Sequence, residues 1–416
     1  MSDPHLDRAR QLDRTDPLAG FRDRFVIADP EVVYLDGNSL GRLPEATRLR
    51  LAEVVAEWGT DLIGGWERWI DVGREAGDVI AGIVGAWPGE VVLSDSTSVN
   101  LYKLAGAALD ARPDRTVIVA DDDNFPTDRY ILEGVAAARG GAVRMVKTDP
   151  DAGVATADVA AALDGDVALV CLSHVAYRSG ALADLPAITA AAHGTGALVV
   201  WDLCHSAGAV PVGLRAADVD LAVGCTYKYL NGGPGAPAFL YVRQELQTRL
   251  RQPIWGWFGQ ADQFAMGPSY APLPDIRRFL VGTPPVLSAY AALEGAALTA
   301  EAGIEAIAAK GRALGDYVIE LADEWLTPLG FTVASPRAAQ QRGAHVTLHH
   351  PQGWQVCQAL KAARVIPDYR APNRLRLGLA PLYTRFVDVH SGLSRLRDVV
   401  RTGEHHAYPS EPSGIT

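Results

Sequence analysis

The chain has 416 residues, which is long for one compact domain and suits a large domain joined to a smaller one. A hydrophobic content of 48% with 21% charged residues is ordinary for a globular protein and permits a large buried core. The formal net charge of −11 disfavours non-specific binding to nucleic acid and to an anionic membrane.

The amino-terminal residues 1–14 are charged and lack the apolar segment of a secretory signal. No apolar run approaches the ~20 residues that a bilayer span needs. We therefore expect a soluble, cytoplasmic protein with neither a nucleic-acid nor a membrane partner. Cys171, Cys204, Cys225 and Cys357 form no C-x-x-C pair, so we expect reduced, buried thiols and no metal site.

Short apolar runs rich in Val and Ala predict the strands of a sheet, at 116–120, 142–146, 167–172, 197–201, 221–225 and 238–242. Helical patterns separate most of these runs, for example at 127–139 and 185–193. This alternation predicts an α/β fold with a mainly parallel sheet that helices cover on both faces. Ligands of such sheets bind beyond the carboxyl ends of the strands, where Ser173 and Asp202 fall.

From Pro285 the periodicity becomes helical, at 287–298 and 304–325, and a strand, helix, strand, helix series follows to about Thr402. This pattern predicts a smaller α+β domain. One of its strands would separate His345 and His349 by about 13 Å, so these histidines do not predict a metal site.

Asp202 and Lys228 each follow an apolar run and would lie at neighbouring edges of the sheet. Pyridoxal phosphate (PLP) chemistry needs such a pair: an acid that keeps the pyridine nitrogen protonated and an amine that forms the Schiff base. Either residue alone is more simply a helix cap or a solvated side chain. The nearby His205 and the glycine-rich segment 231–239 favour the cofactor interpretation.

Eight motifs extend this interpretation from Tyr34 to Tyr383. They are YLDGNSLG, SDSTSVNLYKL, DNFPTDRY, LSHVAYRSG, WDLCHSAGAVP, TYKYLNGGPGAP, GWFG and RLRLGLAPLY. In these motifs the chain resembles the kynureninases, a family with the type I PLP-dependent fold in the class V aminotransferase superfamily. GNSLG and TYKYLNGGPG are specific together, whereas SHxxxxSG with a strand-end Asp is shared with cysteine desulfurases.

The resemblance implies the domain organisation. An amino-terminal segment, 1–60, would pack with the small domain, the large PLP-binding domain would span 61–285, and the small domain would span 286–402. The tail, 403–416, is rich in Pro, Ser and His, and we expect it to be frayed.

The cofactor contacts that the resemblance implies agree with simple chemistry. Hydroxyls before the helical run 99–109 would form a phosphate cradle, and an aromatic side chain after a strand could stack on the pyridine ring. The residues expected to contact PLP are Thr97, Ser98, Phe125, Pro126, Thr127, Asp128, Ser173, Asp202, His205, Tyr227 and Lys228. Trp257 and Thr283 match positions that reach the phosphate of a neighbouring subunit, which implies a homodimer with shared sites.

The resemblance also implies the substrate contacts. Arg376 is expected to clamp the α-carboxylate, in preference to Arg374, because it lies five residues before the proline of PLY. Trp66, Ser39 and Tyr177 are expected to form the slot for the aromatic ring. Trp66, where vertebrate members tend to have His, would favour kynurenine over its 3-hydroxy derivative.

The implied activity is the hydrolysis of the Cβ–Cγ bond of L-kynurenine to anthranilate and L-alanine in tryptophan catabolism. Lys228, Tyr227 and Asp202 would carry the chemistry. The use of 3-hydroxykynurenine, the group that activates water and a role in NAD biosynthesis stay open. Two alternatives also stay open: a cysteine desulfurase or class V aminotransferase, and a PLP-fold binding protein without turnover. A desulfurase needs a reactive Cys on a late mobile loop, which the sequence does not provide.

Overall fold

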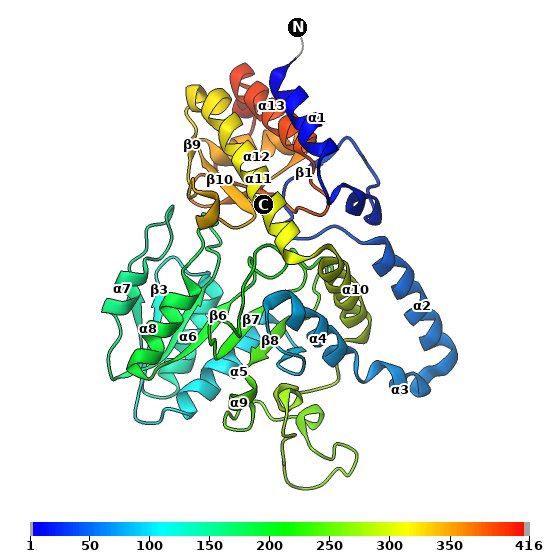
Figure 1. The fold of residues 1–416 in the computed structure, drawn as a ribbon, viewed down its shortest axis with the longest axis vertical. Helices are drawn as coiled ribbons and strands as arrows, with labels where there is room; N and C mark the ends of the chain where they lie inside the picture. Colours follow the sequence, from blue (N-terminus) through cyan, green and yellow to red (C-terminus); the bar gives the residue numbers. More distant parts are fainter. Residues whose placement is uncertain (1–2, 412–416) are drawn as a thin grey trace.

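Two packed parts make up the protein, and the computed structural model describes them over residues 3–411 (Figure 1). The strands of the larger part are β2 (Val91–Leu93), β3 (Val117–Asp121), β4 (Ala142–Val146), β5 (Val167–Ser173), β6 (Leu198–Asp202), β7 (Leu221–Gly224) and β8 (Phe239–Val242). They form one sheet in the order β2-β8-β7-β6-β5-β3-β4, in which β8 alone runs antiparallel to its neighbours among the described strands.

The six strands predicted from apolar runs are all present, and no predicted end differs from the observed end by more than one residue. The sequence prediction missed β2, because a strand of three residues is too short to show a period. Alternate residues of the strands face opposite cores. On β3, for example, Val119 packs in one hydrophobic cluster, and Ile118 and Ala120 pack in another.

Helices cover both faces of the large sheet. They are α4 (Val72–Val84), α5 (Thr97–Asp110), α6 (Pro126–Ala137), α7 (Thr156–Ala161), α8 (Leu185–Thr195), α9 (Gln244–Gln247) and α10 (Val286–Ala302). α4, α7, α8 and α10 contribute to one core, and α5 and α6 contribute to the other. The large sheet is therefore buried on both sides, as predicted for parallel strands.

The smaller part has its own core around an antiparallel sheet with the order β12-β13-β10-β9. Its elements are α11 (Ile304–Leu321), β9 (Thr332–Val333), β10 (His345–His349), α12 (Gly353–Ala362), β11 (Val365–Ile366), β12 (Asp368–Arg370), β13 (Arg374–Gly378) and α13 (Phe386–Thr402). α11 continues into a π-helical turn, Ala322–Leu326.

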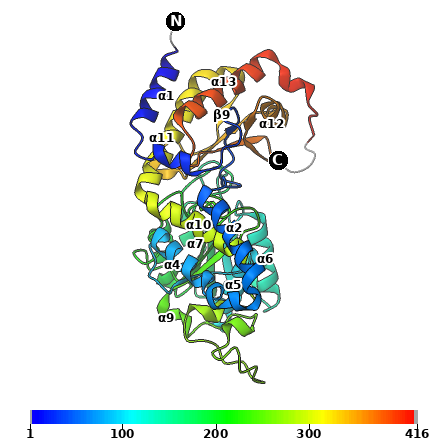
Figure 2. The same ribbon diagram turned by 90° about the vertical axis from the view of Figure 1, so that its right-hand side faces the viewer.

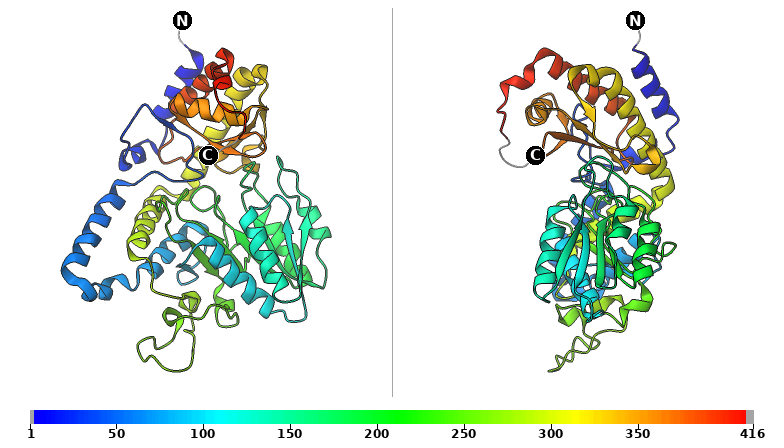
Figure 3. Two further views of the ribbon diagram at one scale, coloured as in Figure 1. Left: turned by 180° about the vertical axis from the view of Figure 1, so that it is seen from behind. Right: turned by 90° about the vertical axis from the view of Figure 1, so that its left-hand side faces the viewer.

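The amino-terminal segment is divided between the two parts. α1 (Pro4–Arg14) contacts α13, and β1 (Val33–Tyr34) pairs with β11 in parallel (Figure 2). α2 (Glu45–Asp61) instead contacts α10 and, with η2 (Leu62–Gly65) and α3 (Trp66–Trp69), projects from the body (Figure 3).

The packing of two helices differs from the expected domain division. α2 lies before residue 60 yet contacts α10, and α10 lies after residue 285 yet packs on the large sheet. A helical period identifies a helix but not the sheet that it covers, which explains the difference. The domain boundaries stay a prediction.

The tail is packed as far as residue 408, which differs from the fraying expected for 403–416. Gly403 ends α13 with a φ of 77°, and η8 (Glu404–Ala407) follows. His405 is 2% exposed, and its Nε2 lies 3.0 Å from Oε1 of Gln352. Residues 412–416 lie outside the described residues. None of the helices within 3–411 combines the length and the apolar character needed to traverse a bilayer.

Candidate active site

Two neighbouring strands end side by side and carry Ser173 and Asp202. β5 and β6 are parallel, and their register pairs these two residues. Asp202 is buried; its Oδ1 accepts a hydrogen bond from the backbone N–H of Cys204 at 2.8 Å, and its Oδ2 lies 3.4 Å from Oγ of Ser173. These donors stabilise a carboxylate at the carboxyl edge of the sheet.

Lys228 lies at the same edge, after β7, and its amine points at His205. The Nζ of Lys228 is 3.0 Å from Nε2 of His205. Since a protonated amine can only donate, Nε2 is the acceptor in that state. Burial, and then the charge of Lys228, hold the pKa of His205 well below its usual range, so this imidazole stays neutral.

A loop of the amino-terminal segment closes against the backbone of Lys228. The N–H of Gly41 donates to the carbonyl oxygen of Tyr227 at 2.8 Å. A Cβ at position 41 would lie only 2.4 Å from the carbonyl oxygen of Lys228, so the approach requires glycine. This contact explains the final glycine of the GNSLG motif.

The amino end of α5 faces the same cavity. Ser96 caps the helix by accepting from the N–H of Val99 at 3.3 Å, and Thr97 and Ser98 form the first turn. Free N–H groups and the helix dipole make such a turn suited to an anion. The residues that line the cavity are Thr97, Ser98, Phe125, Thr127, Asp128, Tyr177, Asp202, Cys204, His205, Tyr227 and Lys228.

The cavity therefore brings together most of the residues that the motifs predicted for a cofactor. Pro126 begins α6 between two lining residues, and Ser173 contacts Asp202. Asp128 is also buried beside Asp202, and burial, followed by the charge of Asp202, raises the pKa of Asp128 well above its usual range. Asp128 thus favours its protonated form.

Arg376 connects the smaller part to this cavity. Its Nη1 donates to the carbonyl oxygen of Tyr177 at 2.5 Å, and its Nη2 donates to Oγ of Ser39 at 3.2 Å. The ring of Tyr177 lines the cavity and meets the ring of Phe125 edge to face, with centroids 5.4 Å apart. Arg374, two residues earlier on β13, instead pairs with Asp151 at 2.5 Å.

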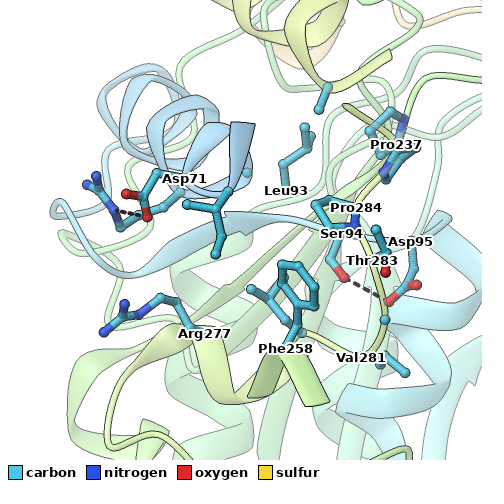
Figure 4. Close-up of a pocket in the computed structure, with 17 residues that line it drawn as sticks. Asp71, Leu93, Ser94, Asp95, Pro237, Phe258, Arg277, Val281, Thr283 and Pro284 are labelled. Carbon is cyan, nitrogen blue, oxygen red and sulfur yellow. Dashed lines mark hydrogen bonds and ion pairs between the residues drawn. The ribbon is translucent and has the colours of Figure 1, made fainter. Parts of the chain in front are cut away.

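Trp66, Trp257 and Thr283 lie outside the Lys228 cavity of the same chain, and we call them the outer group. Trp66 and Trp257 both contact Phe258, with ring centroids 6.3 and 4.7 Å apart. Thr283 and Phe258 line a second cavity beside Asp95 (Figure 4). The three residues therefore gather around Phe258 on one face, although the chain separates them widely.

Comparisons with known proteins agree on one family. A family model described as the kynureninase C-terminal domain matches residues 307–396. The kynureninase of Burkholderia pseudomallei (strain K96243) is 45% identical over 405 residues, which cover 95% of this chain and 95% of that protein. The chain belongs to the kynureninase family. The kynureninase of Pseudomonas fluorescens is 43% identical over 398 residues, which cover 94% of each chain.

Solved structures of other enzymes share the fold of this kynureninase-family chain. A cysteine desulfurase of Thermococcus onnurineus NA1 has a TM-score of 0.78 at 19% identity and covers 97% of this chain and 99% of that one. A cysteine desulfurase of Escherichia coli has a TM-score of 0.77 at 17% identity, with 92% and 98% covered. The predicted type I PLP-dependent fold is confirmed, and family membership makes the chain a PLP-dependent hydrolase of carbon–carbon bonds.

The residues of the cavity fit PLP. Lys228 offers the amine, Asp202 offers a buried carboxylate for the pyridine nitrogen, and the first turn of α5 offers N–H groups and hydroxyls for the phosphate. Oδ2 of Asp128 is buried without a hydrogen-bond partner among the described residues, so one polar atom of the cavity still needs a ligand.

Sequence reasoning missed two residues in contact with the site. Cys204 lines the cavity, and its Sγ lies 3.7 Å from Oγ1 of Thr97. Its place two residues after Asp202, at a strand end, could have revealed it. Asp368 binds Arg376, and the turn-forming Pro372-Asn373 pair could have indicated the hairpin that brings them together.

Proposed function

We propose that this chain hydrolyses the Cβ–Cγ bond of L-kynurenine to anthranilate and L-alanine, with PLP held at Lys228. The observation that carries the proposal is the Lys228 cavity: an amine, a buried carboxylate and a helix amino end converge there, and Arg376 adjoins it. The first three features suit PLP, which carries an aldehyde, a pyridine nitrogen and a phosphate, and a buried guanidinium suits the carboxylate of an amino acid substrate.

Each residue has a role that follows from its surroundings. Bound PLP supplies an electron sink for the electrons of broken bonds at the amino acid. Asp202 would pair with the pyridine nitrogen and keep that sink cationic, since its two oxygens already lie against the N–H of Cys204 and the hydroxyl of Ser173 at the sheet edge. The amine of Lys228 moves the proton at Cα, and the neutral His205 accepts a hydrogen bond from it.

Tyr227 is the proposed donor of the proton that the alanine fragment needs. It lines the cavity beside Lys228, and the neighbouring Cys225, together with burial, raises the pKa of its phenol. A phenol with a raised pKa keeps its proton at neutral pH and can pass it to a carbanion.

The two ends of the substrate would contact different parts of the chain. Arg376 would bind the α-carboxylate, and Ser39 and Tyr177 touch that guanidinium. Trp66 would contact the aromatic ring. Since Trp66 lies in the outer group, it would reach the ring in a neighbouring subunit rather than in its own.

We infer a homodimer with shared sites from the exposed apolar surface near the outer group. Large apolar side chains on α2 and η2 face solvent, with Trp58 59% and Ile63 81% exposed. Trp58 also lines an apolar groove with Trp66 and Leu287. An apolar surface of this kind is typical of a protein interface, and a second copy would place the outer group against the Lys228 cavity.

The setting of the reaction follows from the same proposal. We place the protein in the cytoplasm, in tryptophan catabolism, with no nucleic-acid partner because its net charge is −11. The fold is shared with cysteine desulfurases, but all four cysteines are buried, which disfavours a thiol nucleophile on an exposed loop.

The decisive experiment mixes the purified protein with PLP and L-kynurenine and follows the fluorescence of anthranilate. We expect anthranilate and L-alanine in equal amounts. The same protein with L-cysteine should release no sulfide. Sulfide without anthranilate would establish the desulfurase alternative, and binding of PLP without either product would establish the binding-protein alternative.

A further inference from the structure

Arg376 is a buried cation whose two edges have different partners. It is 1% exposed. Its Nε donates to Oδ2 of Asp368 at 2.6 Å, and its Nη2 donates to the same oxygen. On the opposite edge, Nη1 donates to the carbonyl oxygen of Tyr177, and Nη2, besides its bond to Asp368, donates to the neutral Oγ of Ser39. One edge is thus neutralised within the protein, and the other faces the segments that border the Lys228 cavity.

The hairpin of β12 and β13 fixes this arrangement. The antiparallel register places Asp368 directly opposite Arg376. Asp368 is also 1% exposed and pairs with Arg370 on its own strand at 3.2 Å. Because both partners are on neighbouring strands, the carboxylate can hardly move relative to the guanidinium.

A second acid could compete for Arg376. Asp36 lies in the loop that carries Ser39, and Asn38 lies between Asp36 and Arg376. In the amide orientation that satisfies both neighbours, the Asn38 nitrogen donates to Oδ1 of Asp36 at 3.3 Å, and its oxygen accepts from Nε and Nη2 of Arg376 at 3.3 Å. Without the charge of Asp368, the guanidinium would turn towards Asp36, and the edge that faces the cavity would turn with it.

We propose that Asp368 is a positioning residue that holds Arg376 with its Nη1–Nη2 edge directed at the α-carboxylate of the amino acid. The inference rests on the proposed function, because it takes Arg376 as the carboxylate clamp. Asp368 occupies the inner edge, so a carboxylate can bind Arg376 only through two parallel hydrogen bonds at the outer edge. This geometry selects a carboxylate at one distance and angle from the reacting carbon.

The test compares two small ligands with the PLP-loaded protein. L-Alanine carries the α-carboxylate and ethylamine lacks it, and the binding of both changes the absorbance of the cofactor. Asp368→Asn should weaken the binding of L-alanine by about tenfold and leave the binding of ethylamine unchanged, because only L-alanine has a carboxylate for Arg376. The Michaelis constant for L-kynurenine should rise similarly, with kcat changed less than about threefold.

The chain offers a matched control, because Arg374 lies on the same strand as Arg376 and also pairs with a carboxylate. Asp151→Asn removes the carboxylate that pairs with Arg374, and it should change the affinity for neither ligand. Asp368→Glu keeps the charge, and so the fold, but displaces the guanidinium; it should weaken L-alanine at least about threefold. Should Asp368→Asn fail to fold, this variant decides the question.

Two results would overturn the inference. Equal weakening of L-alanine and ethylamine would make Asp368 merely structural, and wild-type affinity for L-alanine in both Asp368 variants would show that Arg376 needs no partner. The outcome is separate from the proposed function, because L-alanine binding requires no cleavage. If Asp368→Asn weakens only L-alanine binding but the wild type releases no anthranilate, the role of Asp368 stands and the proposed reaction is wrong.

Discussion

The Lys228 cavity and the outer group differ in how complete each is within one chain. The cavity lies beyond the ends of β3, β6 and β7 and at the starts of α5 and α6, and the Gly41 loop contacts the backbone beside its lysine. Its central carboxyl group, that of Asp202, is buried. Two members of the outer group are exposed, with Trp257 38% exposed and Thr283 facing solvent, whereas Trp66 is half-buried against the core. Both sets of residues match positions that the resemblance to one family implies.

The difference supports our proposal that each chain provides the Lys228 cavity by itself and depends on a neighbouring subunit for the outer group. The outer group, which we propose for phosphate and ring contacts, gathers around Phe258, and none of its three residues lines the Lys228 cavity of the same chain. A residue that matches a family motif but points away from its own site is best explained by use in a neighbouring subunit.

The sharpest test of the Lys228 cavity is the substitution Lys228→Ala. We expect activity to fall by at least about a thousandfold, because no other amine lines the cavity within the described residues. Borohydride should no longer attach PLP covalently to the protein, while circular dichroism stays that of the wild type. A reducible adduct on another lysine would move the site elsewhere.

The role of the outer group can be tested by mixing two inactive variants, Lys228→Ala and Trp257→Ala. If Trp257 acts in the neighbouring subunit, each heterodimer contains one site with both residues intact. Random reassociation should then restore about a quarter of the wild-type activity.

Asp202→Asn in place of Trp257→Ala is the matched control for this mixture. Asp202 and Lys228 line the same cavity of one chain, so every site in that heterodimer lacks one of them and no activity should return. Recovery in both mixtures, or in neither, would contradict the division into a cavity and an outer group.

A buried histidine after β5 predicts a pH dependence of stability. His174 follows β5, and burial lowers its pKa from 6.5 to about 4. The unfolded chain therefore binds a proton that the folded chain rejects, and stability falls as the pH drops below 6.5 towards 4. Between pH 7.5 and 5, His174→Phe should lose about 2 kcal/mol less unfolding free energy than the wild type. Urea unfolding at both pH values measures these free energies. An equal loss in the wild type and in His174→Phe would refute the assignment to His174.

The smallest expected effect concerns the outer group, in Trp66→His. Imidazole can hydrogen-bond the extra hydroxyl of 3-hydroxykynurenine, where indole offers mainly a stacking face. The ratio of kcat/KM for the two substrates should shift towards the hydroxylated one by about 1 kcal/mol. Trp58→His, in the same groove, serves as a control that should leave the ratio unchanged. An unchanged ratio in Trp66→His would leave this residue in the apolar core alone.

The sequence predicted the features that depend on local signals. Apolar runs located the strands, and the motifs located Asp202 and Lys228, because strand ends and helix starts are encoded by neighbouring residues. Contacts between distant segments were not predictable in this way. The pairing of Asp368 with Arg376 depends on hairpin register, and the packing of α10 on the large sheet depends on which core had room for it.

The Gly41 loop has a practical consequence for anyone who alters the amino terminus. Leu35 accepts a hydrogen bond from Gly378 of the smaller part at 2.7 Å, Ser39 touches Arg376, and Gly41 donates to the carbonyl oxygen next to Lys228. Seven consecutive residues thus tie both parts of the protein together at the reacting end. A truncation that reaches this stretch would act as a double mutation of the clamp and of the lysine loop, so shortened expression variants should begin well before Leu35.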